Sequence, residues 1–218
     1  MPRRGKFITF EGLDGCGKST QMGRLADALR EQGLNVVTTR EPGGTAIGER
    51  IRGVVLDSRT QGLDPLAELA MMFAARAQHV NELILPAIHA GKWVLCDRFT
   101  DSSEAYQGGG RKLGSEAVLT LHRVLCGDLK PDLTILMTSD VAASVERARR
   151  RNTRKKSAKD ENRFEQENRA FFQRVMHAYL AIAKREPERV IAVNARRAIP
   201  VVHREILQIV NERLQHSK

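Results

Sequence analysis

Residues 12–19 of the chain read Gly-Leu-Asp-Gly-Cys-Gly-Lys-Ser and match the pattern G-x-x-x-x-G-K-[ST] at every fixed position. The apolar run FITF (7–10) precedes this motif, and apolar residues at helical spacing follow it. A glycine-rich turn between a buried strand and a helix can direct its backbone N–H groups at phosphate oxygens, and the helix adds the positive end of its dipole. The motif and its context therefore predict a phosphate-binding P-loop.

The chemistry of a P-loop gives its residues expected roles. Lys18 is expected to reach the β- and γ-phosphates of a nucleotide, and the Ser19 hydroxyl is expected to bind Mg²⁺. Asp97, at the end of a later apolar run, would orient a Mg²⁺-bound water. The expected binding site for ATP as phosphoryl donor comprises Gly12, Leu13, Asp14, Gly15, Cys16, Gly17, Lys18, Ser19 and Thr20.

A P-loop alone does not define a reaction, because GTPases, ATPases and small-molecule kinases share it. A GTPase should carry a guanine-reading Asn-Lys-x-Asp after a later strand, and this sequence has none. Two alternatives remain open at this point: nucleotide hydrolysis coupled to motion, and phosphoryl transfer to a small acceptor.

Apolar runs and helical patterns alternate along the chain. Five runs indicate strands: FITF (7–10), NVVTTR (35–40), WVLCD (93–97), DLTILM (132–137) and RVIAVN (189–194). Helical spacing is found at 18–32, from 65 to Gly91 with a kink or break expected at Pro86, at 115–126, after Asp140, at 164–185 and from Pro200. Nearly all-apolar strands that alternate with helices predict an α/β fold of the P-loop NTPase kind, a five-stranded parallel sheet with helices on both faces. We expect a single domain over residues 1–218.

The net charge of +10 is concentrated in one segment. Residues 147–163 contain nine Lys/Arg and two acids, a net of +7, so the remainder carries +3. A local basic segment suits a small polyanion at least as well as a nucleic acid, so a nucleic-acid partner is not expected. The sequence has no apolar stretch of about 18 residues and no signal-peptide core, and its three cysteines lack metal-ligand spacing. These features predict a cytoplasmic protein with reduced thiols and no membrane partner.

Ligands of open parallel sheets bind beyond the carboxyl ends of the strands. Arg40-Glu41-Pro42-Gly43-Gly44 follows the second expected strand, Asp97-Arg98-Phe99 ends the third, and Tyr106–Arg111 comes shortly after. Two arginines at strand ends could hold the phosphate of a second nucleotide. The alternative for Asp97 and Arg98 is a structural ion pair at a strand end.

The combination EGLDGCGKST, REPGG, DRF, AYQGGGR and RFEQE, in this order, resembles the thymidylate kinases of the bacterial type. The resemblance extends over nearly the whole chain. It implies a P-loop kinase fold, usually a homodimer, and the transfer of a phosphoryl group from ATP to dTMP with Mg²⁺, which gives ADP and dTDP for dTTP biosynthesis.

The resemblance also implies roles for individual residues in dTMP binding. Arg98 would hold the dTMP phosphate with Arg40 nearby, and Asp14 would face the sugar 3′-hydroxyl and the metal region, although a loop-stabilising role for Asp14 stays open. Tyr106 would pack beside the deoxyribose, Arg76 would bond the base carbonyl, and Ser103 and Gln107 would reach the thymine edge. The residue that stacks on the base is either Met72 or Phe73, with core packing as the alternative for both. The expected dTMP-binding residues are Asp14, Arg40, Met72, Phe73, Arg76, Arg98, Ser103, Tyr106 and Gln107.

The bacterial type lacks an arginine after the P-loop carboxylate, where this chain has Gly15, and the resemblance implies that a lid supplies catalytic arginines instead. The expected lid spans about 147–163 and is longer than usual. The expected catalytic residues are Lys18, Arg98, Arg149, Arg151 and Arg163. Two other functions remain as alternatives: a kinase for another monophosphate, and a non-catalytic protein that binds nucleotides or nucleic acid through the basic segment.

Overall fold

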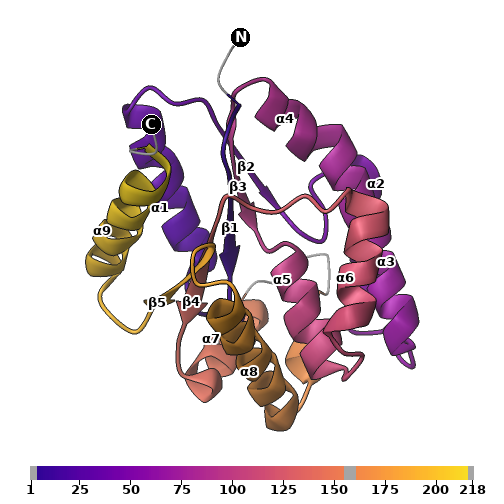
Figure 1. Cartoon of the computed structure of the whole chain (residues 1–218). Coiled ribbons are helices and arrows are strands. Elements are labelled where there is room, and N and C mark those ends of the chain that lie inside the picture. Colours follow the sequence, from indigo (N-terminus) through magenta and orange to yellow (C-terminus); the bar gives the residue numbers. More distant parts are fainter. Residues whose placement is uncertain (1–3, 155–160, 216–218) are drawn as a thin grey trace.

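The computed structural model describes residues 4–154 and 161–215 of the chain, and side-chain positions for residues 4–150 and 161–214. It contains a five-stranded sheet in the order β2-β3-β1-β4-β5, in which all neighbouring strands are parallel (Figure 1). The strands are β1 (Phe7–Glu11), β2 (Val36–Arg40), β3 (Trp93–Asp97), β4 (Leu133–Thr138) and β5 (Val190–Asn194). The α/β fold with a five-stranded parallel sheet that the sequence predicts is confirmed.

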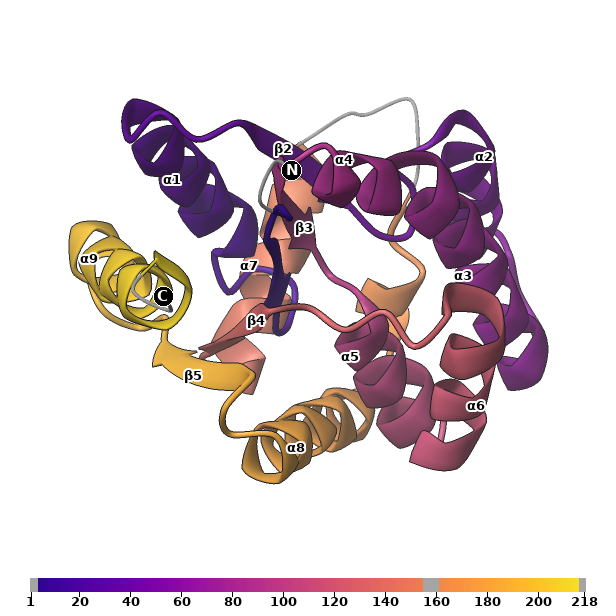
Figure 2. The ribbon, with the colours of Figure 1, turned by 45° about the horizontal axis from the view of Figure 1, so that its top comes forward.

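Helices cover both faces of the sheet (Figures 1 and 2). On one face lie α1 (Lys18–Glu31) and α9 (Ile199–Val210), which pack on a core that contains Ile8 and Phe10 of the central strand. Phe7 points to the opposite core, because successive side chains of a strand alternate between faces. The helices of that second face are α2 (Ala46–Val55), α3 (Pro65–His79), α4 (Leu85–His89), α5 (Thr100–Ser103), α6 (Ser115–Cys126), α7 (Val141–Arg154) and α8 (Arg169–Arg185).

The long helical region that begins at residue 65 does not break at Pro86. Asp64 caps α3 by accepting from the Leu66 and Ala67 backbone N–H groups, and a π-helical turn at Val80–Ile84 connects α3 to α4. The wider turn accommodates a proline that cannot donate to the preceding turn, so the helix continues. Gly91, with φ of 75°, follows the end of α4, as expected.

One other boundary differs from the expectations, and two helices were not expected. The helix expected at 164–185 begins at Arg169, because the Asn168 side chain caps it by accepting from the Phe171 N–H at 2.9 Å; a 3₁₀ turn at Phe164–Gln166 precedes it. The sequence analysis also missed α2, which Thr45 caps, and α5, which continues through a π-helical segment at Glu104–Gly110. Both missed elements follow strand ends and are short, so each shows little helical periodicity in the sequence.

In the described residues, no helix is long and apolar enough to cross a membrane.

Candidate functional site

The P-loop connects the end of β1 to the start of α1. Its Gly12, Gly15 and Gly17 all have positive φ, a conformation that side chains other than glycine rarely adopt. Lys18 is buried, and its Nζ donates to the carbonyl oxygens of Gly12 at 3.1 Å and Leu13 at 3.0 Å. The ammonium group therefore lies across the mouth of the loop, where a bound phosphate would compete with the carbonyls for it.

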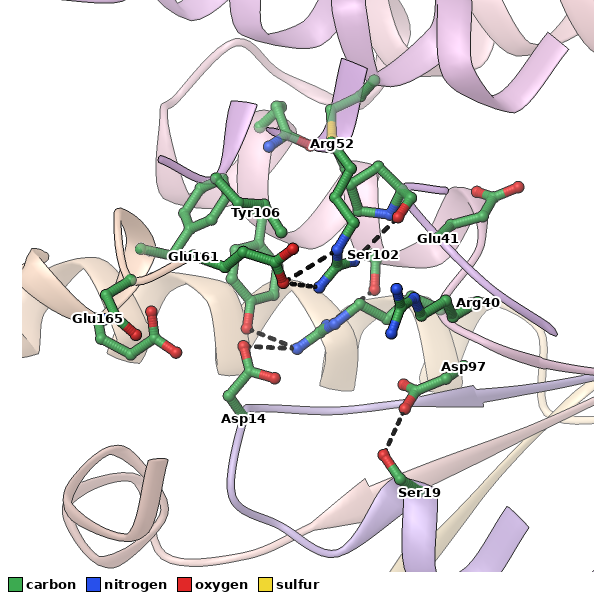
Figure 3. Close-up of a pocket in the computed structure, with 17 residues that line it drawn as sticks. Asp14, Ser19, Arg40, Glu41, Arg52, Asp97, Ser102, Tyr106, Glu161 and Glu165 are labelled. Carbon is green, nitrogen blue, oxygen red and sulfur yellow. Dashed lines mark hydrogen bonds and ion pairs between the residues drawn. The ribbon is translucent and has the colours of Figure 1, made fainter. Parts of the chain in front are cut away.

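Ser19 and Asp97 lie together, one at the start of α1 and the other at the end of β3. The Ser19 hydroxyl donates to Asp97 Oδ2 at 2.8 Å (Figure 3). A hydroxyl and a carboxylate beside a phosphate loop suit Mg²⁺, which binds through one or two protein oxygens and keeps several waters. The donor set therefore fits the metal role expected for the two residues.

A cavity of about 400 Å³ opens beside the P-loop, at the carboxyl ends of β1, β2 and β3. Its lining residues come from the P-loop, the ends of β2 and β3, α2, α3, the α5 region and the segment before α8 (Figure 3). The lining includes these residues named in the sequence analysis: Asp14, Ser19, Arg40, Met72, Asp97, Arg98, Tyr106 and Gln107.

Arg98 links the P-loop to the α5 region at the wall of this cavity. Its Nη2 lies 3.0 Å from Asp14 Oδ2 and donates to the Tyr106 hydroxyl at 3.1 Å, while Nη1 donates to Ser102 Oγ and the Tyr179 hydroxyl. The ion pair of Arg98 is thus with Asp14 of the P-loop, and Asp97 bonds Ser19 instead. Arg98 has φ of 76°, which is unfavourable for a residue with a side chain and marks a position of functional interest.

Three of the expected dTMP-binding residues, Phe73, Arg76 and Ser103, are buried and are not among the residues that line the cavity. Phe73 is fully buried in a core cluster, and the Arg76 guanidinium lies over its ring at 4.6 Å from the centroid. Ser103 is also fully buried and accepts from Arg76 Nη2 at 2.9 Å. Met72, one helical turn before Arg76, lines the cavity. Of the two candidates for base stacking, Met72 is therefore the one that a ligand in this cavity would touch.

A buried network that the sequence analysis did not assign holds Arg76. Glu41 Oε2 accepts from Arg76 Nε at 2.6 Å, and Glu41 Oε1 lies 2.9 Å from His79 Nδ1. Burial by itself would raise the pKa of Glu41, but the Arg76 guanidinium and the His79 contact hold this pKa below its usual range. The sequence offered one indication of this network: Glu41 lies within REPGG, directly after an expected strand.

Comparisons with known proteins agree with this geometry. The family model described as thymidylate kinase matches residues 10–206. A thymidylate kinase from Pelobacter propionicus is 46% identical over 98% of this chain and 97% of its own length, and one from Thiobacillus denitrificans is 48% identical over 97% and 99%. The crystal structure of thymidylate kinase from Ehrlichia chaffeensis is 35% identical, covers 95% of this chain and 99% of its own, and superposes with a TM-score of 0.75.

The chain belongs to the thymidylate kinase family. It is therefore a kinase. The family also decides between the two alternatives left open by the motif, in favour of phosphoryl transfer to a nucleoside monophosphate.

The arginines expected in the lid of this kinase have different surroundings. Arg147, on α7, donates through Nε to Gly15 O of the P-loop at 2.9 Å, whereas Arg149 donates to the Glu165 and Glu167 carbonyls. Arg163 is buried, donates to Val55 O and to Glu68 Oε2, and does not line the cavity. The side chain of Arg151 and residues 155–160 of the expected lid lie outside the described residues.

Glu11, the last residue of β1, is a buried carboxyl that the sequence analysis quoted without giving it a role. Oε1 accepts from the Phe99 N–H at 2.7 Å, and Oε2 accepts from the Ser102 hydroxyl at 2.5 Å and the Tyr179 hydroxyl at 3.0 Å. Burial, followed by the charge of Asp101, raises the pKa of Glu11 from 4.5 to about 7 despite these donors. Glu11 therefore changes protonation near neutral pH beneath the Arg98 network.

The raised pKa of Glu11 predicts a pH-dependent term in stability. Between pH 4.5 and 7 the folded protein holds a proton that the unfolded chain has released, so the free energy of unfolding falls as pH rises through this window. Relative to the Glu11→Gln variant, wild type should lose on the order of 3 kcal/mol between about pH 4.5 and 7.5. Urea unfolding of both proteins across this range measures the difference, with Glu116→Gln, at an exposed position, as the control for removing a carboxyl. If the unfolding free energy of wild type minus that of Glu11→Gln stays constant or grows as pH rises, the raised pKa of Glu11 is contradicted.

Gly15 of the P-loop lies close against α7, and this packing predicts that an added side chain at Gly15 is harmful. An added Cβ at Gly15 would lie 2.3 Å from Ser144 O and 3.0 Å from Ala148 N, both backbone atoms of α7. Gly15→Ala should therefore displace the loop or the helix, lower the free energy of unfolding by about 1–3 kcal/mol and raise KM for ATP roughly tenfold.

The matched control is Gly23→Ala, inside α1, where an added Cβ meets nothing within 4 Å. This variant should gain about 0.5–1 kcal/mol in unfolding free energy, because alanine favours helix over glycine, and should keep wild-type kinetics. Steady-state kinetics and denaturant unfolding measure both variants. Wild-type KM for ATP in Gly15→Ala would show that the contact is unimportant.

Proposed function

We propose that the cavity beside the P-loop binds dTMP and that this kinase transfers the γ-phosphoryl group of ATP to it there. The products are ADP and dTDP, in a step of dTTP biosynthesis. The proposal is supported by the family of the chain and by the position of the cavity between the P-loop and the residues expected to bind dTMP.

The proposal that dTMP is the phosphoryl acceptor rests on two buried polar atoms. Arg76 Nη1 and Gln107 Oε1 are buried and have no hydrogen-bond partner in the part of the chain that the structure describes. An unpaired buried donor and an unpaired buried acceptor are costly unless a ligand satisfies them. Thymine presents the complementary pair, a carbonyl oxygen at C4 and an N–H at N3. Cytosine presents a donor amino group at C4 and an acceptor ring nitrogen at N3, so neither position matches.

The remaining parts of dTMP fit the other walls. Arg98, with Arg40 across the cavity, would bind the 5′-phosphate, and Met72 would lie against the base. Tyr106, whose ring lies 4.9 Å from the Arg98 guanidinium carbon, would pack beside the deoxyribose and leave no room for a 2′-hydroxyl. Asp14 would accept a hydrogen bond from the 3′-hydroxyl once Arg98 turns to the phosphate.

On the donor side, Lys18 would exchange its loop carbonyls for the β- and γ-phosphates of ATP. Ser19 and Asp97 would hold Mg²⁺, which supplies charge neutralisation to the phosphate oxygens when it is bound. Arg98 orients the acceptor phosphate for in-line attack, and the developing charge on the transferred group is stabilised by fixed positive groups.

Lid arginines would provide additional positive charge to the transferred phosphoryl group. Arg149 and Arg151 are proposed to reach the transferred phosphoryl group when the lid closes. Arg163 would have to leave Glu68 to act in the same way, and in the structure described here it supports the cavity wall instead.

A coupled ADP-release assay with ATP, Mg²⁺ and each of dTMP, dUMP, UMP, dCMP, AMP and GMP tests the proposal. We expect the highest kcat/KM for dTMP, and UMP should be poor because its 2′-hydroxyl meets Tyr106. Lys18→Met should lower kcat by about 100-fold or more, since it removes charge that stabilises the transferred phosphoryl group. A higher kcat/KM for any other monophosphate would overturn the acceptor assignment.

We also propose a homodimer and a cytoplasmic location. All three cysteines are free, as is usual in a reducing compartment. Apolar side chains are exposed on three helices that pack side by side, α2, α3 and α6 (Figure 1). These side chains are Ile47, Val54, Leu66, Val124 and Leu125. We infer that these side chains form one apolar patch, which is typical of a surface that another subunit covers.

Sedimentation equilibrium tests the dimer. Wild type should have twice the mass of the chain, and Val124→Glu should shift the protein toward monomer, because it places a charge in the apolar patch. Leu180→Glu, at another exposed apolar position on α8, is the control and should remain dimeric. A monomeric wild type, or equal effects of the two variants, would contradict the assignment of this surface.

A further inference from the structure

Glu68, on α3, is a fully buried carboxylate behind the cavity wall. Its Oε1 accepts from Gln107 Nε2 at 2.8 Å. Its Oε2 accepts from Arg163 Nη2 at 2.7 Å and lies 3.1 Å from Arg111 Nη2. Arg111 Nε is 3.3 Å from Oε1 and 3.2 Å from Oε2. Oε2 therefore receives most of the positive charge, and Oε1 is the atom that faces Gln107.

This contact decides which way the Gln107 amide points. An ionised carboxylate accepts hydrogen bonds and donates none, so Gln107 must present its NH₂ group to Glu68. Gln107 lines the cavity, and its Oε1 is buried without a partner among the described residues. The amide oxygen is thus the group that Gln107 leaves available to a ligand. Without a fixed neighbour, an amide can offer either its oxygen or its nitrogen.

We propose that Glu68 is a positioning residue for base selection: it fixes the Gln107 amide with its oxygen toward the bound base. The site then favours a pyrimidine whose ring nitrogen carries a hydrogen, as in thymine, over one whose ring nitrogen is an acceptor, as in cytosine. The inference rests on the proposed function, in which Gln107 reads the base. It adds a residue that never touches the substrate but sets the polarity of the contact.

The two arginines make the proposal testable by a single-atom change. In Glu68→Gln, the amide oxygen should stay at the Oε2 position, because Arg163 and Arg111 donate to it there. The new NH₂ group then occupies the Oε1 position and faces the NH₂ of Gln107. Two donors repel, so the Gln107 amide should rotate and offer its NH₂ to the base.

The measurement is kcat/KM for dTMP and dCMP, with KM for ATP as the internal reference. Glu68→Gln should reduce the dTMP:dCMP ratio of kcat/KM roughly 100-fold, the scale of one buried polar group left without its hydrogen bond. KM for ATP should remain at the wild-type value, which a general loss of structure would not allow. Calorimetric binding of dTMP and dCMP in the absence of ATP should show the same reduction in the ratio of the two affinities.

The exchanged double variant Glu68→Gln/Gln107→Glu provides the rescue. The carboxylate introduced at position 107 would accept from the amide introduced at position 68 and present its second oxygen to the base. The preference for dTMP should therefore return with the total charge unchanged. Glu68→Asp keeps the carboxylate for the arginines but withdraws it from Gln107, and should lower the dTMP:dCMP ratio by a smaller factor. If Glu68→Gln fails to fold, as judged by its thermal unfolding, the dTMP:dCMP ratio of Glu68→Asp tests the role of Glu68.

The outcomes separate this inference from the proposed function. A wild type that prefers another monophosphate, or a Gln107→Leu variant with unchanged selectivity, would contradict the proposed function. Selectivity that falls in Gln107→Leu but is retained in folded Glu68→Gln and Glu68→Asp would overturn the role of Glu68 alone. A reduced dTMP:dCMP ratio in Glu68→Gln, with rescue in the double variant, is the result we expect.

Discussion

The parallel register of β1 and β3 is the constraint on which the site depends. Phe10 lies opposite Asp97, so the loop that leaves β1 and the residues that end β3 emerge side by side. This places Ser19 against Asp97 and Asp14 against Arg98, although the members of each pair are far apart in the sequence. An antiparallel pairing would send the two strand ends to opposite edges of the sheet, and neither contact could form.

Three buried carboxyl groups lie in or behind the cavity wall, and each binds a neighbouring polar side chain. Glu11 holds the Arg98 region through Ser102 and Tyr179, Glu41 holds Arg76, and Glu68 holds Gln107. Burial of a carboxylate is unfavourable unless donors surround it, so each carboxylate also fixes the donors that it requires. Polar side chains around the cavity are therefore held by buried carboxyl groups, two of which, Glu11 and Glu68, do not line it.

Sequence reasoning predicted the strands well, because buried parallel strands are continuous apolar runs bounded by turn residues. It predicted the P-loop from spacing, and the family from five motifs in order. It missed α2 and α5, whose helical pattern is short and begins directly after Gly-Gly or Arg-Phe at a strand end. It also began α8 at Phe164, whose aromatic spacing continues that of the helix although the chain turns at Asn168.

By itself, the sequence determined the α/β class, the order of the strands along the chain, the phosphate loop and the kinase family, because each of these depends on local spacing or on ordered motifs. The tertiary structure alone decided that Met72 lines the cavity while Phe73 enters the core, that Arg163 pairs with Glu68, and that Gln107 presents its oxygen. These outcomes depend on which side of a helix faces the cavity and on which distant donors surround a buried charge. Both are set by packing between elements that are far apart in the chain.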